Sequence, residues 1–215
     1  MNSNVENLLL EWPLCVIKDV DIATVISDSP RRYSTVNRAL KKGILVRLRR
    51  GTYLIGKPYT KASPSNFQIA HSIYGPGYIS FESALFFHQW IPEAVYTTTC
   101  ATTKRANEFK TPLGVFQYVH VPERLCYVGV ERVGVDEDAF FMASPWKALA
   151  DHYYVYHRNW NCLDDLHLDM RIEMEAMFES DLKTLQTLSE HYQSSRVRKF
   201  LSKILRGLTD GNKNH

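Results

Sequence analysis

The segment 28–56 constrains the fold most, because a helical pattern runs directly into a strand pattern there. DSPRRYSTVNRALKKG has Ser29 as a capping residue, Pro30 in the first turn and Gly43 at its end, the usual start and stop signals of a helix. ILVRLRRGTYLIG then alternates with period two and turns at Arg50-Gly51, which predicts a short β-hairpin.

Two shorter amphipathic patterns precede this segment. The first runs from Val5 to Trp12, and the second reaches Ile26 from Asp19 or Asp21, either of which can cap a helix. Val16-Ile17 is too short to assign. The order of three helices and a hairpin within about 55 residues is typical of a winged helix-turn-helix.

Basic residues gather in the same part of the chain. The whole chain has 26 Lys or Arg, 23 Asp or Glu and a formal net charge of +3, whereas residues 29–57 contain nine basic residues and no acidic one. A local excess of this kind is typical of a surface that binds a polyanion, and a solvated basic face gives the same pattern. The hydrophobic fraction of 45% excludes a disordered or collagen-like chain.

We expect the third helix and the hairpin to contact DNA. Polar and guanidinium groups on the exposed face of such a helix can reach base edges in the major groove, and arginines of a hairpin can bind phosphates or the minor groove. Tyr33, Val36, Ala39 and Leu40 are expected to face inward, and Arg47 and Arg49 to share one face of the hairpin. The predicted DNA-binding residues are Arg31, Arg32, Ser34, Thr35, Arg38, Lys41, Lys42, Arg47, Arg49 and Arg50.

The remaining sequence predicts an α+β fold with three further parts. Residues 58–66 lack apolar periodicity and form a linker after the winged helix-turn-helix at 1–57. Residues 67–157 combine helical patterns with β-branched runs, which predicts a mixed α/β domain with a small, mostly antiparallel sheet. Residues 158–210 form a C-terminal helical region with an acidic first half and a basic second half.

Local patterns give further expectations for this second part. Ser144 and Pro145 are the cap and first residue of a helix. The aromatic side chains Phe86 and Phe87 are expected mostly in the core. The basic segment 196–206 either adds a second DNA contact or packs against the acidic stretch before it.

Signals for enzyme chemistry are weak. His152 and His157 are five residues apart, which does not place two metal ligands on one helical face, and the four scattered cysteines form no CxxC pair. Lys147 and Asp151 have the spacing of an ordinary helix ion pair. We therefore expect no catalytic residues, no metal and no cofactor. A metal-dependent nuclease and a protein-interaction module remain alternatives.

No apolar run is long enough to span a bilayer, and the N-terminus lacks the basic region of a secretion signal. We therefore expect a cytoplasmic protein without a membrane partner.

Four stretches in order carry a family resemblance: LVRLRRGTYLIG, YISFESALFFHQWIPE, TTKRANEFKTPLGVFQYVHVP and ASPWKALADHYY. Together they resemble the AbiEi antitoxins of AbiE-type (type IV) bacterial toxin–antitoxin systems, from about Ile17 to Tyr154. The resemblance implies a DNA-binding autorepressor that binds inverted repeats in the operator of its own operon, alone or as a dimer or cooperative pair. It also implies a cognate nucleotidyltransferase-like toxin that the antitoxin antagonises without a stable complex.

The resemblance also assigns site residues in the second part of the chain. Lys104, Arg105, Lys147 and Asp151 fall at matching motif positions and form an expected antitoxin surface. One position departs from the family pattern, because Trp146 stands where members commonly carry an acidic residue after the proline. Any role of that acid in toxin neutralisation is therefore in doubt for this chain.

Overall fold

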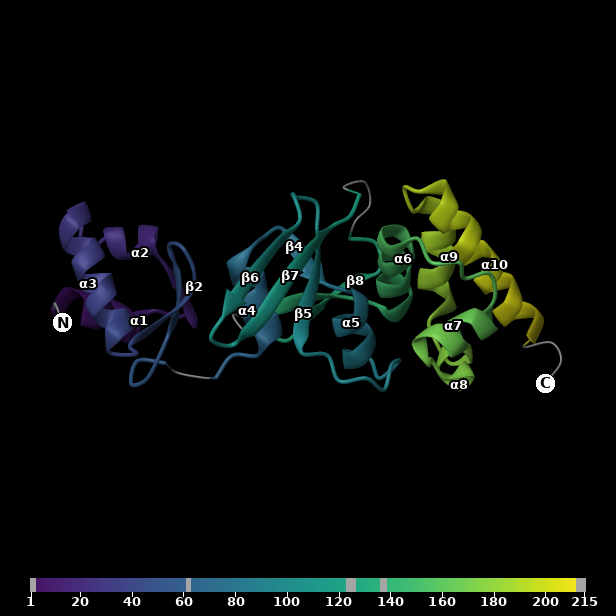
Figure 1. The fold of residues 1–215 in the computed structure, drawn as a ribbon, viewed down its shortest axis with the longest axis horizontal. Helices are drawn as coiled ribbons and strands as arrows, with labels where there is room; N and C mark the ends of the chain where they lie inside the picture. Colours follow the sequence, from purple (N-terminus) through teal and green to yellow (C-terminus); the bar gives the residue numbers. More distant parts are fainter. Residues whose placement is uncertain (1–2, 61–62, 123–126, 136–138, 212–215) are drawn as a thin grey trace.

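The computed structural model describes residues 3–60, 63–122, 127–135 and 139–211. The molecule is elongated, with the N-terminal elements at one end, a sheet in the middle and the C-terminal helices at the other end (Figure 1). None of the described helices is long and apolar enough to cross a membrane. The N-terminal elements and the C-terminal helices lie far apart in this elongated shape (Figure 1).

Residues 3–60, here called the N-terminal unit, contain helices and a small sheet. In these residues the helices are α1 (Ser3–Glu11), α2 (Asp19–Ala23) and α3 (Ser29–Lys41), and the strands are β1 (Val16–Lys18), β2 (Leu45–Arg49) and β3 (Thr52–Ile55). The strands form an antiparallel sheet in the order β1-β3-β2. The predicted hairpin is therefore present, and the segment that the sequence left unassigned adds a third strand.

The two faces of this sheet belong to different hydrophobic clusters. Its inner face packs on α1, α2 and α3 through Ile17, Leu45, Tyr53 and Ile55. Its outer face joins the core of the next part of the chain through Val16, Leu48 and Leu54. Because successive residues of a strand point to opposite faces, three short strands supply both clusters.

The next part is built on a central sheet with the strand order β6-β7-β5-β4-β9-β8. Its elements are α4 (Asn66–Ile73), β4 (Gly77–Ile79), α5 (Phe81–Phe87), β5 (Thr97–Thr102), β6 (Asn107–Thr111), β7 (Gly114–His120), β8 (Val130–Val133), β9 (Phe140–Ala143) and α6 (Pro145–Tyr156). Pairs β4–β9 and β5–β7 are parallel, and β4–β5, β6–β7 and β8–β9 are antiparallel. The predicted mixed α/β region with a small, largely antiparallel sheet is confirmed.

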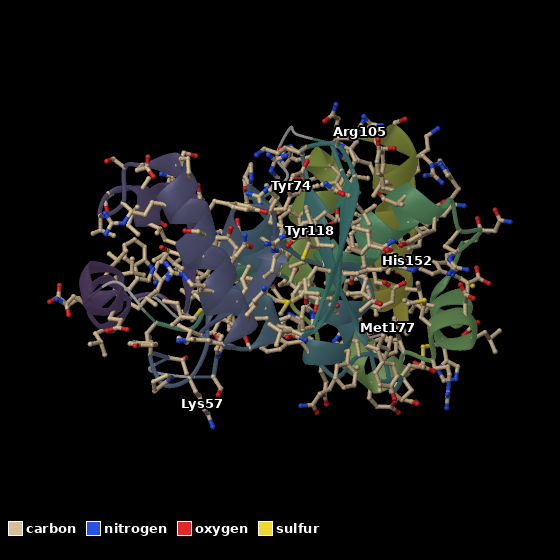
Figure 2. The ribbon with its side chains drawn as sticks, turned by 60° about the vertical axis from the view of Figure 1, so that its left-hand side comes forward. Lys57, Tyr74, Arg105, Tyr118, His152 and Met177 are labelled. Atoms are coloured by element: carbon tan, nitrogen blue, oxygen red, sulfur yellow. The ribbon has the colours of Figure 1, made fainter. Side chains whose placement is uncertain are left out.

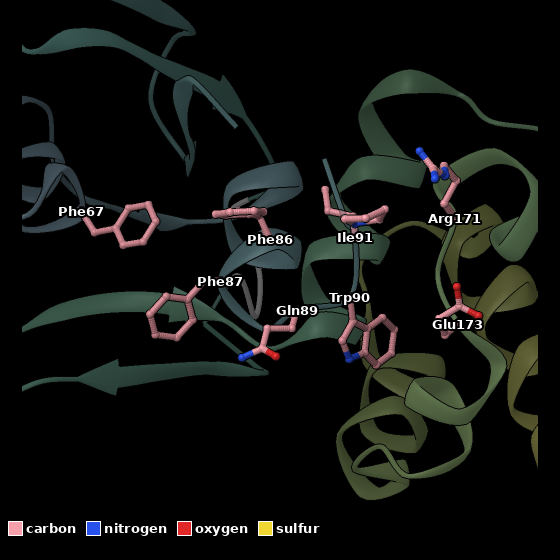
Figure 3. A pocket seen from close by; sticks show the side chains of 9 residues that line it. Phe67, Phe86, Phe87, Gln89, Trp90, Ile91, Arg171 and Glu173 are labelled. Atoms are coloured by element: carbon pink, nitrogen blue, oxygen red, sulfur yellow. The ribbon is translucent and has the colours of Figure 1, made fainter. Parts of the chain in front are cut away.

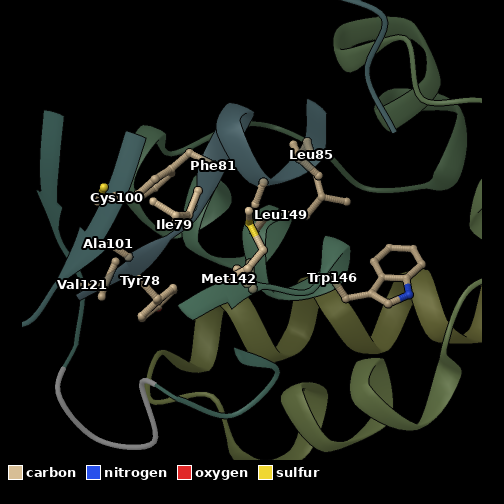
Figure 4. Packing of buried hydrophobic residues seen from close by; sticks show 14 of the residues in the cluster. Tyr78, Ile79, Phe81, Leu85, Cys100, Ala101, Val121, Met142, Trp146 and Leu149 are labelled. Carbon is tan, nitrogen blue, oxygen red and sulfur yellow. The ribbon is translucent and has the colours of Figure 1, made fainter. Parts of the chain in front are cut away.

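Buried apolar side chains fill the space between the central sheet and α5 and α6 (Figure 4). Ile79 and Met142 lie opposite each other on the parallel pair β4–β9, and both are buried. Leu85 of α5 and Leu149 of α6 are also fully buried in this cluster. The helices thus pack on the sheet through apolar side chains.

The predicted C-terminal helices are present as well. They are α7 (Leu163–Met170), α8 (Met174–Phe178), α9 (Leu182–His191) and α10 (Ser195–Gly211). The inward stripe of α10 is fully apolar and consists of Val197, Phe200, Leu201, Ile204 and Leu208. This spacing is that of an amphipathic helix, which explains why a strongly basic segment still packs on the core.

Three local predictions are tested by these elements. Ser144 caps α6, and its hydroxyl accepts a hydrogen bond from the Lys147 backbone N–H, as predicted. The cap of α3 is Asp28 rather than Ser29, because the Asp28 carboxylate accepts from the Arg31 N–H at 2.8 Å. Phe86 and Phe87 were expected in the core but are about two-fifths exposed.

Candidate nucleic-acid interface

Helix α3 is fixed at both ends by local sequence. The Asp28 carboxylate satisfies a free N–H of the first turn, where Pro30 needs no hydrogen bond. The helix ends at Lys41, and Gly43 follows with a φ of +69°, a left-handed conformation that favours glycine. The helix therefore stops where the hairpin must begin.

Not every residue predicted to contact DNA lies on the outer face of α3. Arg31, Ser34, Arg38, Lys41 and Lys42 are exposed, as the prediction requires. Thr35 is only 2% exposed, and its hydroxyl donates to the Arg31 carbonyl oxygen, so its assignment to the DNA-binding face is wrong. The expectation for Tyr33 is also wrong, because this side chain is 70% exposed rather than inward-facing.

Arg32 has a structural position that the sequence did not show. Its guanidinium forms an ion pair with Asp19 of α2 at 3.2 Å and donates to the Ile26 and Ser27 carbonyl oxygens at 2.9 and 3.1 Å. The side chain is 16% exposed. Arg32 therefore joins α3 to α2 and to the connecting turn, and it sets the angle between the two helices.

We expect Arg32→Ala to lower the free energy of unfolding by about 1.5–3 kcal/mol, the usual value for hydrogen bonds that involve a charged group. Arg32→Lys should recover only part of this loss, because an ammonium cannot bind a carboxylate and two carbonyls in the same fork. Urea unfolding measures both variants. The exposed neighbour Arg31→Ala is the control, and an equal loss there would contradict a structural role for Arg32.

The arginines of the hairpin point in different directions. A register shift between Arg47 and Arg49 places Arg47 opposite Tyr53 and Arg49 opposite Thr52. The Arg49 guanidinium donates to the Thr52 hydroxyl at 3.2 Å. Burial and Cys100 raise the pKa of Tyr118, and the Arg49 charge acts in the opposite direction, so Arg49 is near β7. The prediction that Arg47 and Arg49 share a face is therefore wrong.

A groove of about 550 Å³ separates α3 from the tip of the hairpin. We call it the α3–hairpin groove; its walls include Ser29, Arg32, Tyr33, Asn37, Arg47 and Arg50. Burial and the Asp19 carboxylate raise the pKa of Tyr53 in its floor, whereas Arg47 lowers it. Within the described residues, neither Arg47 nor Arg50 forms an ion pair or a side-chain hydrogen bond.

Two guanidinium groups that lack protein partners and line a polar groove can bind anionic groups such as phosphates. The sequence pattern did not single out Tyr33 and Asn37, which share the groove with them. Tyr33 is exposed and Asn37 is half-buried in the structure, and both line this groove beside the buried Val36.

The expected antitoxin surface is divided between the exterior and the core. Lys147 and Asp151 are 2% and 0% exposed, and their Nζ and Oδ1 atoms are 2.6 Å apart. Asp151 also accepts hydrogen bonds from the hydroxyls of Tyr78, Ser80 and Tyr192. The assignment of this pair to a surface is wrong, because it forms a buried polar cluster between β4, α6 and the end of α9.

Lys104 and Arg105 are exposed in the loop after β5. Figure 2 shows Arg105 at the edge of the molecule. The Lys104 ammonium donates to the Gly75 carbonyl oxygen and lies 5.5 Å from the centre of the Tyr74 ring. Tyr74 in turn donates to the Arg105 carbonyl oxygen and packs edge-on against Tyr118. Arg105 is thus the more available charge of the two.

Two arginines of the basic segment 196–206 bind backbone carbonyl oxygens instead of the acidic stretch before them. Arg196 donates to the Tyr153 and Tyr154 carbonyl oxygens near the end of α6. Arg198 donates to the Tyr192 and Gln193 carbonyl oxygens. These charges cap helix ends rather than pair with the acidic stretch, and α10 lies at the opposite end of the molecule from α3 (Figure 1).

A second groove, of about 560 Å³, lies between α5 and the segment joining α7 to α8 (Figure 3). Phe67, Phe86, Phe87 and Ile91 form its apolar walls, and Arg171, which is paired with Glu93 at 2.9 Å, lies at its rim. The described residues also contain no group of three or more His, Cys, Asp or Glu that could hold a metal ion.

Trp146, the departure from the family pattern, is a core residue. It is 1% exposed, packs edge-on against Trp90 at 4.8 Å and donates its indole N–H to the Ser180 hydroxyl at 2.9 Å. A large side chain thus joins α6 to the segment after α8. An acidic side chain at this position would face the same apolar surroundings.

Comparison with known proteins finds a family match within the N-terminal unit. No curated protein matches the chain. Residues 16–56 match the sequence pattern of a family described as transcriptional regulator, AbiEi antitoxin. The matched segment runs from the start of β1 to the residue after β3, and it includes α3 and both walls of the α3–hairpin groove. Over residues 16–56 the chain is therefore similar to the AbiEi antitoxin family of transcriptional regulators, in line with the resemblance of its sequence.

Proposed function

We propose that this chain is a DNA-binding autorepressor and antitoxin of a type IV toxin–antitoxin system. The observation that carries the proposal is the α3–hairpin groove, which Arg47 and Arg50 line without an ion pair or side-chain hydrogen bond among the described residues. In a winged helix-turn-helix, one helix enters the major groove of DNA and a basic hairpin lies beside that helix. The family match over residues 16–56 supports the same role.

We assign DNA binding to residues 1–57, with 58–66 as the linker, 67–157 as the antitoxin-like domain and 158–210 as the C-terminal helical region. Phosphate contacts fall to Arg31, Lys41, Lys42, Arg47 and Arg50, which are exposed. Ser34 and Arg38 are exposed on the same face of α3. The DNA is an inverted repeat upstream of the chain's own gene, bound by two copies.

The C-terminal part antagonises a nucleotidyltransferase-like toxin without a stable complex. Arg105 is the residue of the expected antitoxin surface that remains available, because Lys147 and Asp151 are buried and Lys104 is bound to Gly75. The proposed antitoxin surface thus contains fewer residues than the sequence motif suggested.

A mobility-shift titration tests the DNA-binding part. The purified chain is titrated against the DNA directly upstream of its gene, with unrelated competitor DNA, at two salt concentrations. We expect shifts that resist the competitor and weaken with salt, with log K falling by about 0.9 per log unit of salt for each phosphate contacted. Binding no tighter than to unrelated DNA would overturn the autorepressor.

A further inference from the structure

Asn37 is half-buried on the side of α3 that faces the α3–hairpin groove. It lies one turn from Tyr33 and one turn from Lys41, both of which are exposed. It also lines the α3–hairpin groove, across from Arg47 and Arg50. A duplex whose phosphates are held by the hairpin arginines would therefore lie close to this part of the helix.

Three neighbouring side chains of α3, Ser34, Arg38 and Arg32, are already bound within the helix or to its neighbours. The Ser34 hydroxyl donates to the Arg31 carbonyl oxygen at 2.9 Å, and the Arg38 guanidinium donates to the Ser34 carbonyl oxygen at 3.4 Å. Arg32 is bound to Asp19. In the part of the chain that the structure describes, the Asn37 carboxamide makes no hydrogen bond. It retains two donors and an acceptor for a ligand.

We propose that Asn37 selects an adenine in the major groove and so sets the base preference of this protein. This inference rests on the DNA binding proposed above. The carboxamide oxygen accepts from the adenine N6 amino group while the amide nitrogen donates to N7, a pair that no other base offers in this geometry. Arg47 and Arg50 hold the backbone of the same site, which leaves the discrimination between bases to the helix.

The experiment uses the full chain and two variants, Asn37→Ala and the control Lys41→Ala. Preferred sites are selected from a randomised duplex library, and the preferred duplex is then remade with 7-deaza-2′-deoxyadenosine at each adenine in turn. We expect one adenine at which the loss of N7 weakens DNA binding by the wild-type chain about tenfold. This value follows from the usual contribution of a bidentate contact to a base. Asn37→Ala should bind the normal and modified duplexes equally. Lys41→Ala, which removes a proposed phosphate contact, should bind every duplex more weakly and keep the wild-type preference for the unmodified adenine.

The other outcomes are distinct. If Asn37→Ala selects the same sites and keeps the full N7 effect, or if the wild-type chain shows no base preference, the inference is wrong and DNA binding stands. If no duplex binds at any salt concentration, both the inference and the proposed function are wrong. A thermal melt of each variant shows that the fold is retained, since Asn37 makes no bond in the described residues whose loss would unfold α3.

Discussion

Replacing Arg47 and Arg50 together by alanine is expected to abolish most of the affinity for the upstream DNA. Each side chain lines the α3–hairpin groove and lacks a protein partner among the described residues. A hydrogen bond to a charged group contributes about 1.5–3 kcal/mol, so two lost contacts should weaken binding by about 10²- to 10⁴-fold. The slope of log K against log salt should also fall by about 1.8, at about 0.9 per phosphate.

Arg49→Ala is the matched control, because it removes a guanidinium two residues from Arg47 on the same strand. Arg49 donates to Thr52 and lies near Tyr118, so its loss should leave the salt slope unchanged. The measurement is a binding titration at four or more salt concentrations. A slope lowered equally by Arg49→Ala would show that the register shift does not decide which arginine meets DNA.

The second large effect concerns stability and the buried polar cluster. Asp151→Leu leaves the Lys147 ammonium buried without its carboxylate, and removal of one partner of a buried ion pair costs about 3–5 kcal/mol. That is a large fraction of the roughly 5–15 kcal/mol by which a typical native domain is stable. Lys147→Met should cost less, because three hydroxyls still donate to Asp151. Urea unfolding at pH 7 measures both losses.

Glu108→Gln is the control for charge alone. Its partner Lys110 lies 3.6 Å away, and the two side chains are 80% and 48% exposed for Lys110 and Glu108. An exposed pair of this kind contributes at most about 1 kcal/mol. If Asp151→Leu cost no more than this control, the buried pair would not hold α6 against β4.

The order of the elements could be predicted from the sequence, because most were marked by signals a few residues long. Gly43 and Gly51 adopt the left-handed backbone that a helix end and a tight turn require, and Ser144 caps α6. Strand β1 lacked such a signal, because three residues form a strand only when β3 supplies their hydrogen bonds. Its assignment therefore depended on tertiary contacts.

The candidate site was predicted less well for the same reason. Helical spacing placed the basic residues of α3 on the surface, but Thr35 was misplaced because a polar side chain can bury its hydroxyl on its own backbone. The sequence predicts a DNA contact for Arg32 because it does not show that the fold brings Asp19 next to this side chain. The roles of Arg47 and Arg49 depended on a register shift that simple alternation does not show.

The sheet that contributes to both hydrophobic clusters has a mechanical consequence. The hairpin cannot swing away from the central sheet unless Val16, Leu48 and Leu54 leave a packed core. The direction of α3 is thus fixed relative to the distant C-terminal helices. If DNA binds at the N-terminal end of the molecule, α10 at the other end would point away from the DNA at a fixed distance and orientation. Two copies on an inverted repeat would hold their far ends at a spacing set by the DNA itself.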